Sequence, residues 1–281
     1  MIKLSVNSVL FGGFDYETVA RYIASTGYDG IEIAALPRMA EHLVLDNWKE
    51  QADELLAINE KYGLKFTGTE AGVLLDEDRM EKAFQAAAHL GIPNVNVGSG
   101  GKTGSEEDFQ EVIRKLKILL EKAEKYKVNL NVKPHVGSVI HDEETTLRML
   151  DMVSSPYLGV NLDPSHLHRN GENAHEVFPK MASHVKHIHI RDCLGRDQGP
   201  GKPRLQICGR GDIDLYSYLK VIVESGYDGA LSLEVIGANV SNPNDAWADD
   251  IKDKFGLEDV VAIAAESYGY LNAILKHLNA R

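Results

Sequence analysis

The sequence predicts a single (β/α)8 TIM barrel, an α/β fold in which parallel strands and helices alternate. Short β-type apolar runs and longer amphipathic runs alternate eight times along the 281 residues, which favours a closed barrel over an open sheet. The turn after the first strand reads VLFGGFD, so it lacks the GxGxxG sequence of dinucleotide-binding open sheets. Because no linker divides the chain, residues 1–281 are expected to form one domain.

The strands and helices follow from the period of the apolar residues. Strands are expected over residues 2–8, 30–34, 65–70, 94–98, 129–135, 158–163, 185–192 and 230–235. Amphipathic helices are expected between them, among others over 16–27, 47–63, 77–91 and 105–127, with a last helix over 256–278. Several of these helical segments end in glycine just before the next strand, and glycine is a common helix stop.

Two connections are longer than usual for a compact domain. One runs from Cys193 to Asp212 and follows the seventh strand; the other runs from Gly237 to Phe255 and follows the eighth. Long loops are usually lids or binding elements, and barrel enzymes keep their sites at the carboxyl ends of the strands. The basic residues of the first loop therefore indicate either an anchor for phosphate or carboxylate, or a solvated lid.

Composition and charge exclude several classes of protein. The formal net charge is −12, which repels nucleic acid and anionic membranes at long range. No apolar run approaches the roughly 18 residues that span a bilayer, and MIKLSVNSVL leads directly into strand-like alternation. A cytoplasmic protein is therefore expected. The two cysteines, Cys193 and Cys208, are too few for a disulfide framework and are expected to be incidental thiols.

Residue parity predicts which side chains enter the barrel, because successive side chains of a strand point to opposite faces. In the seventh strand Ile188 and Ile190 share one face, and His187, His189 and Arg191 share the other. The apolar face must pack against the helices, which leaves the polar face inside. The same division applies to the fifth, sixth and eighth strands.

Four successive strands therefore bring Lys133, Asp163, His189 and Glu234 together at the carboxyl end of the barrel. Burying ionisable groups is unfavourable unless they are paired or bound to a metal. The cluster is either a salt-bridge network that closes the barrel mouth or a functional site. A site is favoured, because branched apolar residues normally fill such interiors.

The ligand types in this cluster suit a divalent cation. Asp163, His189 and Glu234 provide carboxylate and imidazole ligands of the kind that bind Mn²⁺, Mg²⁺, Co²⁺ or Zn²⁺. A divalent metal is expected, and no organic cofactor. His166 follows Asp163 by three residues in DPSH and is expected either to join as a ligand or to hydrogen-bond the substrate.

The chain resembles the xylose-isomerase-like barrel superfamily of sugar and sugar-phosphate isomerases and epimerases over nearly its whole length. The motifs that carry the resemblance are GYDGIEIA (27–34), LDPSHLH (162–168), HIHIRD (187–192), GRGDID (209–214) and GYDGALSLEV (226–235). The superfamily includes ketose 3-epimerases, hydroxypyruvate isomerase, inosose dehydratase and endonuclease IV. The resemblance implies a metal site made of a Glu, an Asp, a His and a Glu from strands five to eight, of which Asp163, His189 and Glu234 match the last three.

The first of these four ligands is replaced, because the fifth strand ends in Lys133-Pro134-His135. The lysine stands where the resemblance implies a carboxylate that binds metal and moves a proton. Three consequences are open. Lys133 could lose its proton and act as a general base beside a metal, which is favoured narrowly; its ammonium could replace the metal and pair with Asp163 and Glu234; or it could form a Schiff base.

Further residues are expected to bind substrate. Arg210 lies in the GRGDID turn, which the resemblance places near the site, and Glu32 matches a glutamate that the family often has in strand two. Glu32 and Glu70 have inward parity at the ends of strands two and three. His135 and Arg191 complete the expected set.

The sequence thus predicts a sugar or sugar-acid isomerase or epimerase that transfers a proton next to a carbonyl, with Glu234 and Lys133 as catalytic residues. A dehydratase or lyase on a keto sugar or sugar acid, and a metal-free sugar-binding protein, are the alternatives. An endonuclease is disfavoured because the extra zinc histidines are missing and the chain is acidic. Expected partners are a small sugar, sugar phosphate or sugar acid and, in a homo-oligomer, further copies of the chain.

Overall fold

Eight parallel strands form the closed barrel that the sequence predicts, in a computed structural model that describes residues 1–37, 39–72, 76–196, 202–236 and 255–281. The barrel strands are β1 (Lys3–Asn7), β2 (Gly30–Leu36), β4 (Lys65–Glu70), β5 (Asn94–Gly98), β6 (Asn129–Lys133), β7 (Leu158–Leu162), β8 (Val185–Ile190) and β9 (Ala230–Leu233). Each pairs with the next, and β1 pairs with both β9 and β2, so the ring closes. A two-residue antiparallel strand, β3 (Ala40–Glu41), was not expected from the sequence.

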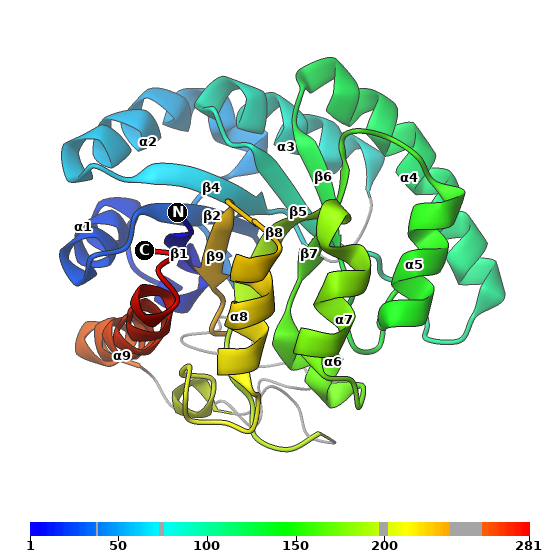
Figure 1. The fold of residues 1–281 in the computed structure, drawn as a ribbon. Helices are drawn as coiled ribbons and strands as arrows, with labels where there is room; N and C mark the ends of the chain where they lie inside the picture. The colour runs from blue at the N-terminus through cyan, green and yellow to red at the C-terminus, as the bar shows by residue number, and fades with distance from the viewer. Residues whose placement is uncertain (38, 73–75, 197–201, 237–254) are drawn as a thin grey trace.

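Helices surround the barrel (Figure 1). They are α1 (Tyr16–Thr26), α2 (Trp48–Tyr62), α3 (Glu77–Leu90), α4 (Glu106–Tyr126), α5 (Glu143–Met152), α6 (Pro164–Arg169), α7 (Ala174–Met181), α8 (Leu215–Glu224) and α9 (Leu257–His277). The N- and C-terminal ends lie side by side (Figure 1), and the Ile2 N–H donates to the Ala280 carbonyl at 3.1 Å.

The helix ends follow the signals in the sequence. The side chains of Asp76 and Ser105 accept hydrogen bonds from the backbone of the first turns of α3 and α4, as N-caps do. Gly27 and Gly91 end α1 and α3 in the left-handed conformation, which glycine adopts without a Cβ clash. The predicted glycine stops are therefore confirmed at these ends, whereas α4 is followed by the left-handed Lys127.

The parity of the strands is also observed. Ile188 and Ile190 belong to the hydrophobic core, while the His189 ring reaches Glu32 of β2 at 2.9 Å. Strand β2 is not a neighbour of β8 in the sheet, so this contact crosses the barrel interior. The polar faces therefore point inward.

The first long loop packs over the end of β8 in its described part. The Asp192 carboxylate accepts hydrogen bonds from the backbone N–H groups of Gly209 (2.9 Å) and Ile213 (3.2 Å). A Cβ on Gly211 would lie 2.3 Å from Asp192 Oδ1, so this position requires glycine. The GRGDID motif is thus a turn built around Asp192. The second long loop, Gly237 to Phe255, lies outside the described residues except at Phe255.

Candidate active site

Lys133 lies at the centre of a buried ionic cluster. Its Nζ donates to Glu234 Oε1 at 2.7 Å, lies 3.1 Å from His189 Nδ1, and is 3.9 Å from Glu70 Oε2. The relative exposure of all four residues is 4% or less. These residues come from strands β6, β8 and β4 and from the end of β9, so the structure brings together the side chains that parity places inside.

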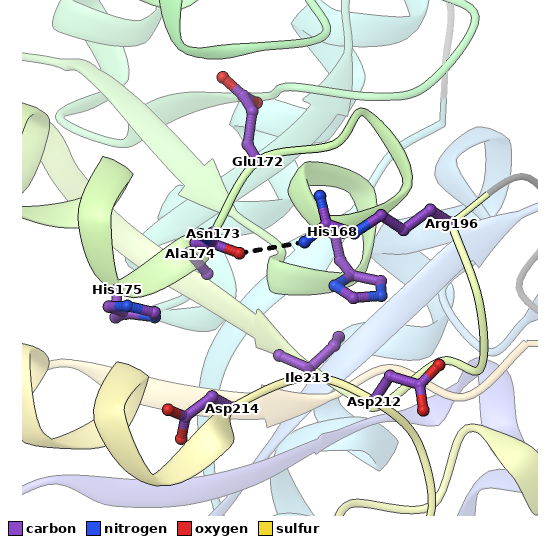
Figure 2. A pocket seen from close by; sticks show the side chains of 9 residues that line it. All are labelled: His168, Glu172, Asn173, Ala174, His175, Arg196, Asp212, Ile213 and Asp214. Carbon is purple, nitrogen blue, oxygen red and sulfur yellow. Dashed lines mark hydrogen bonds between the residues drawn. The ribbon is translucent and has the colours of Figure 1, made fainter.

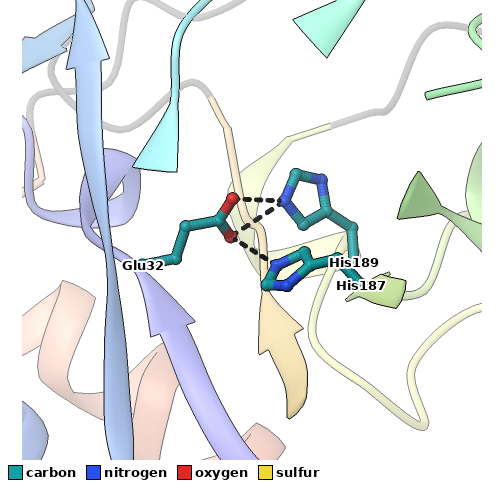
Figure 3. A group of neighbouring side chains, drawn as sticks. All are labelled: Glu32, His187 and His189. Carbon is teal, nitrogen blue, oxygen red and sulfur yellow. Dashed lines mark hydrogen bonds and ion pairs between the residues drawn. The ribbon is translucent and has the colours of Figure 1, made fainter. Parts of the chain in front are cut away.

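Glu32 connects this cluster to the opposite wall. Figure 3 shows its carboxylate facing the rings of His187 and His189, at 3.2 and 2.9 Å. Asn96 Nδ2 and Ser232 Oγ donate to the two Glu32 oxygens at 2.6 Å each. His187 was not among the predicted site residues, although it shares its strand face with His189. Parity was therefore the signal that could have identified it.

Arg191 is a second buried cation of the cluster. It is 1% exposed, and its guanidinium lies 3.1 Å from Asp163 Oδ2 and 3.4 Å from Glu234 Oε2. The same group donates to Ser165 Oγ at 2.8 Å and lies 3.0 Å from His166 Nε2. The buried arginine therefore neutralises two of the three predicted metal ligands.

The remaining predicted residues lie in two places. The His135 ring packs against the His166 ring, with centroids 4.0 Å apart and planes tilted by 38°, and is half-buried at the edge of the cluster. Arg210 is not brought to the cluster; it is exposed and pairs with Glu266 of α9 through two 2.6 Å hydrogen bonds. Substrate binding by Arg210 stays a prediction that none of these contacts supports.

The charges of the cluster determine its protonation. Burial lowers the pKa of Lys133, but the nearby carboxylates of Glu234 and Glu70 outweigh this effect and raise it above its usual value. The surrounding protein groups therefore favour the protonated form of Lys133, and a neutral Lys133 beside a bound metal stays a prediction. Burial raises the pKa of Glu70 to about 7, against the opposing effect of Lys133. Although burial opposes it, the positive charge of His189 holds the pKa of Glu234 well below its usual value.

Two groups of buried residues could hold a metal by ligand type and spacing. They are Glu32 with His187 and His189, and Glu70 with His189 and Glu234; within each group the ligand atoms lie within 4.8 Å of one another. Asp163 belongs to neither group. Its Oδ1 accepts from Ser165, and its Oδ2 faces Arg191.

The residues as they stand do not fit a divalent cation in the second group, because Lys133 contacts all three of its members. The carboxylate of the first group already accepts hydrogen bonds from Asn96 and Ser232. The described cluster is therefore a set of carboxylates balanced by protein cations.

A separate polar pocket lies beside the barrel (Figure 2), lined by His168, Glu172, Asn173, Ala174, His175, Arg196, Asp212, Ile213 and Asp214. Arg196 donates to Asn173 Oδ1 at 3.2 Å and also to the Gly171 carbonyl. This basic residue of the long loop therefore fixes the loop to the start of α7. None of the lining residues belongs to the ionic cluster.

The fold and the cluster define a (β/α)8 barrel with ionisable groups at the carboxyl ends of its strands, the position where barrel enzymes keep their sites. Residues 20–255 match the family model described as xylose isomerase-like TIM barrel. The chain belongs to this family.

Curated relatives include dehydratases. An inosose dehydratase of Clostridium perfringens is 29% identical over 142 residues, which cover 46% of this chain and 48% of that protein. A 3-dehydroshikimate dehydratase of Bacillus anthracis is 19% identical over 193 residues, which cover 65% of this chain and 68% of that protein. The chain thus matches about half the length of the first relative.

Solved structures of similar fold include epimerases. The D-allulose 3-epimerase of Methylomonas sp., solved in complex with D-allulose, has a TM-score of 0.76 at 16% identity, covering 97% of this chain and 96% of that one. At this identity the likeness supports the fold alone. The relatives are enzymes, both epimerases and dehydratases, and no helix among the described residues is long and apolar enough to cross a membrane.

Proposed function

We propose that the protein is an enzyme that removes a proton from the carbon next to a carbonyl in a small sugar, sugar phosphate or sugar acid. The observation that carries this proposal is the buried contact between Glu234 and Lys133, 2.7 Å apart at the carboxyl end of the barrel. It joins a carboxylate, which can accept a proton, to an ammonium, which can stabilise the negative charge that appears on the carbonyl oxygen.

In the proposed reaction the Glu234 carboxylate takes the proton, and the C–H electron pair moves into a carbon–carbon double bond while the carbonyl pair moves to oxygen. Lys133 donates a hydrogen bond to that oxygen. Returning the proton to the former carbonyl carbon gives an isomer, provided that the hydroxyl group on the other carbon passes its proton to the first oxygen and becomes the new carbonyl. Returning a proton to the original carbon from the other face gives an epimer. Isomerase or epimerase activity is the leading proposal.

A dehydratase or lyase is the second candidate, and it is favoured by the dehydratases among the relatives. The enediolate is common to both outcomes; here it collapses by expelling a β-hydroxyl group, which leaves as water after taking up a proton. Glu70 lies 3.6 Å from His189 and 3.9 Å from Lys133, so a second carboxyl group is close to the proposed base. We place it as a substrate-binding or proton-donating group.

Deuterium exchange tests the common first step. Purified protein is incubated in D₂O with a panel of keto sugars, sugar phosphates and keto sugar acids, and NMR follows exchange of the proton next to the carbonyl. Glu234→Gln should slow exchange by about 10²- to 10⁴-fold, whereas Glu54→Gln, at an exposed position on α2, should not. Exchange with a rearranged product supports an isomerase, and loss of water supports a dehydratase. A panel that binds without exchanging supports a sugar-binding protein and overturns the proposal.

A further inference from the structure

We propose that the ammonium of Lys133 takes the place of a divalent cation, so that this protein binds no divalent metal in the cluster of Glu70, His189 and Glu234. Replacing Lys133 by glutamate should convert the same cluster into a metal site. The inference concerns ion binding and does not depend on whether the chain acts on a sugar.

The position of Nζ carries the inference. Nζ lies 2.7 Å from Glu234 Oε1 and 3.1 Å from His189 Nδ1, two atoms that a metal in this group could use. Metal–ligand bonds to such atoms are about 2.0–2.2 Å long. An ion at that distance from both atoms would lie beside the ammonium, and the repulsion between the two positive charges opposes its binding while the lysine stays there.

A second cation opposes the ion from the neighbouring side. The Arg191 guanidinium lies 3.4 Å from Glu234 Oε2 and 3.1 Å from Asp163 Oδ2. Arginine stays protonated in proteins, so both oxygens of Glu234 face protein cations. Adding a divalent ion would place further positive charge beside two buried cations, which is unfavourable at low dielectric.

The surroundings also hold the lysine in place. Glu70 lies 3.9 Å from Nζ, and both side chains are 5% exposed or less. An ammonium among these buried carboxylates is paired, which is the condition for burying a charge. The lysine thus supplies the positive charge that these carboxylates require.

Metal content and binding test the inference directly. Wild-type protein, Lys133→Glu and Lys65→Glu are dialysed against Mn²⁺, desalted and analysed by elemental mass spectrometry, and Mn²⁺ binding is measured by calorimetry. Lys65 is exposed at the first residue of β4, so its substitution makes the same charge change away from the cluster. Lys133→Glu should retain about one Mn²⁺ per chain, and the other two proteins should retain almost none.

Two further variants keep the test decisive. Adding Glu234→Gln to Lys133→Glu removes one ligand and should weaken Mn²⁺ binding by at least about tenfold. If Lys133→Glu does not fold alone, circular dichroism should show that Mn²⁺ restores its fold. Lys133→Gln removes the positive charge without adding a ligand and should bind Mn²⁺ more tightly than wild type. Stoichiometric metal in the wild type, or equal Mn²⁺ affinity in the wild type and both Lys133 variants, would overturn the inference.

Discussion

Replacing Glu32 by glutamine should lower the free energy of unfolding by about 4 kcal/mol. The Glu32 carboxylate is completely buried and accepts hydrogen bonds from Asn96 and Ser232 at 2.6 Å, and it contacts His187 and His189 at 3.2 and 2.9 Å. It therefore ties β5, β8 and β9 to β2 across the interior. Glutamine has nearly the same shape, so the substitution removes charge and one acceptor without leaving a cavity.

The magnitude follows from the contacts that glutamine cannot keep. One carboxylate oxygen becomes an NH₂ group that faces donors, so roughly two hydrogen bonds to a charged acceptor are lost, each with a net contribution of about 1.5–3 kcal/mol. Although burial opposes it, Glu234 and Glu32 raise the pKa of His189 to about 10, so His189 carries a positive charge. Glu32→Gln removes one of the two carboxylates that stabilise this charge. Breaking a buried ion pair costs about 3–5 kcal/mol, which agrees with the expected loss of about 4 kcal/mol.

Urea unfolding, followed by circular dichroism and tryptophan fluorescence, measures the loss. The midpoint should fall while the slope stays unchanged, because the surface exposed on unfolding is the same. Glu60→Gln is the control, since Glu60 is exposed on α2 and its substitution should change the free energy by less than about 0.5 kcal/mol. A loss below about 1 kcal/mol for Glu32→Gln would refute the view that the charge and hydrogen bonds of this carboxylate stabilise the fold.

Three other outcomes are expected. Hydrogen bonds from Lys122 and Tyr126 lower the pKa of Glu81 from 4.5 to about 2, so the stabilisation that Glu81 provides is present above pH 4.5 and is lost as the pH falls to 2. In Glu81→Gln the free energy of unfolding should fall by about 1 kcal/mol less than in the wild type over that pH range. An unchanged pH dependence would contradict this. Gly211→Ala should destabilise by at least about 2 kcal/mol, since its Cβ would lie 2.3 Å from an Asp192 oxygen; a thermal melt unchanged from wild type would show that the turn adapts. Burial raises the pKa of the Cys193 thiol to about 12, so a thiol reagent at pH 8 should modify it only after denaturation; rapid labelling of the native protein would contradict its burial.

Much of the fold was predictable because its signals are local. The alternation of strand and helix periods predicts the barrel, and parity predicts that Lys133, His189, Glu234 and Glu32 point inward; the cross-barrel contacts agree with this. The two-residue β3 was missed because so short a segment has no measurable period. It pairs antiparallel with the end of β2, with Ala40 opposite Leu36 and Glu41 opposite Ala35.

The internal charge balance of the site was not predictable from the sequence. Arg191 is expected from the sequence to point inward and to bind substrate as one of the basic residues after the seventh strand, whereas in the structure its guanidinium pairs with Asp163 and Glu234. The direction of the Lys133 pKa shift depends on its distances to individual carboxylates, and parity gives a face but no distances. Side-chain length and the stagger of neighbouring strands decide those distances.

The closure of the barrel has a consequence for how the chain reaches its native state. Strand β1 pairs along one edge with β9, a segment made more than 200 residues later. During synthesis that edge stays without its partner until nearly all the other strands have left the ribosome. Contacts so distant in sequence slow folding, and the waiting edge offers unpaired backbone groups to other chains. Newly made copies should therefore depend on assistance against aggregation more than finished copies do.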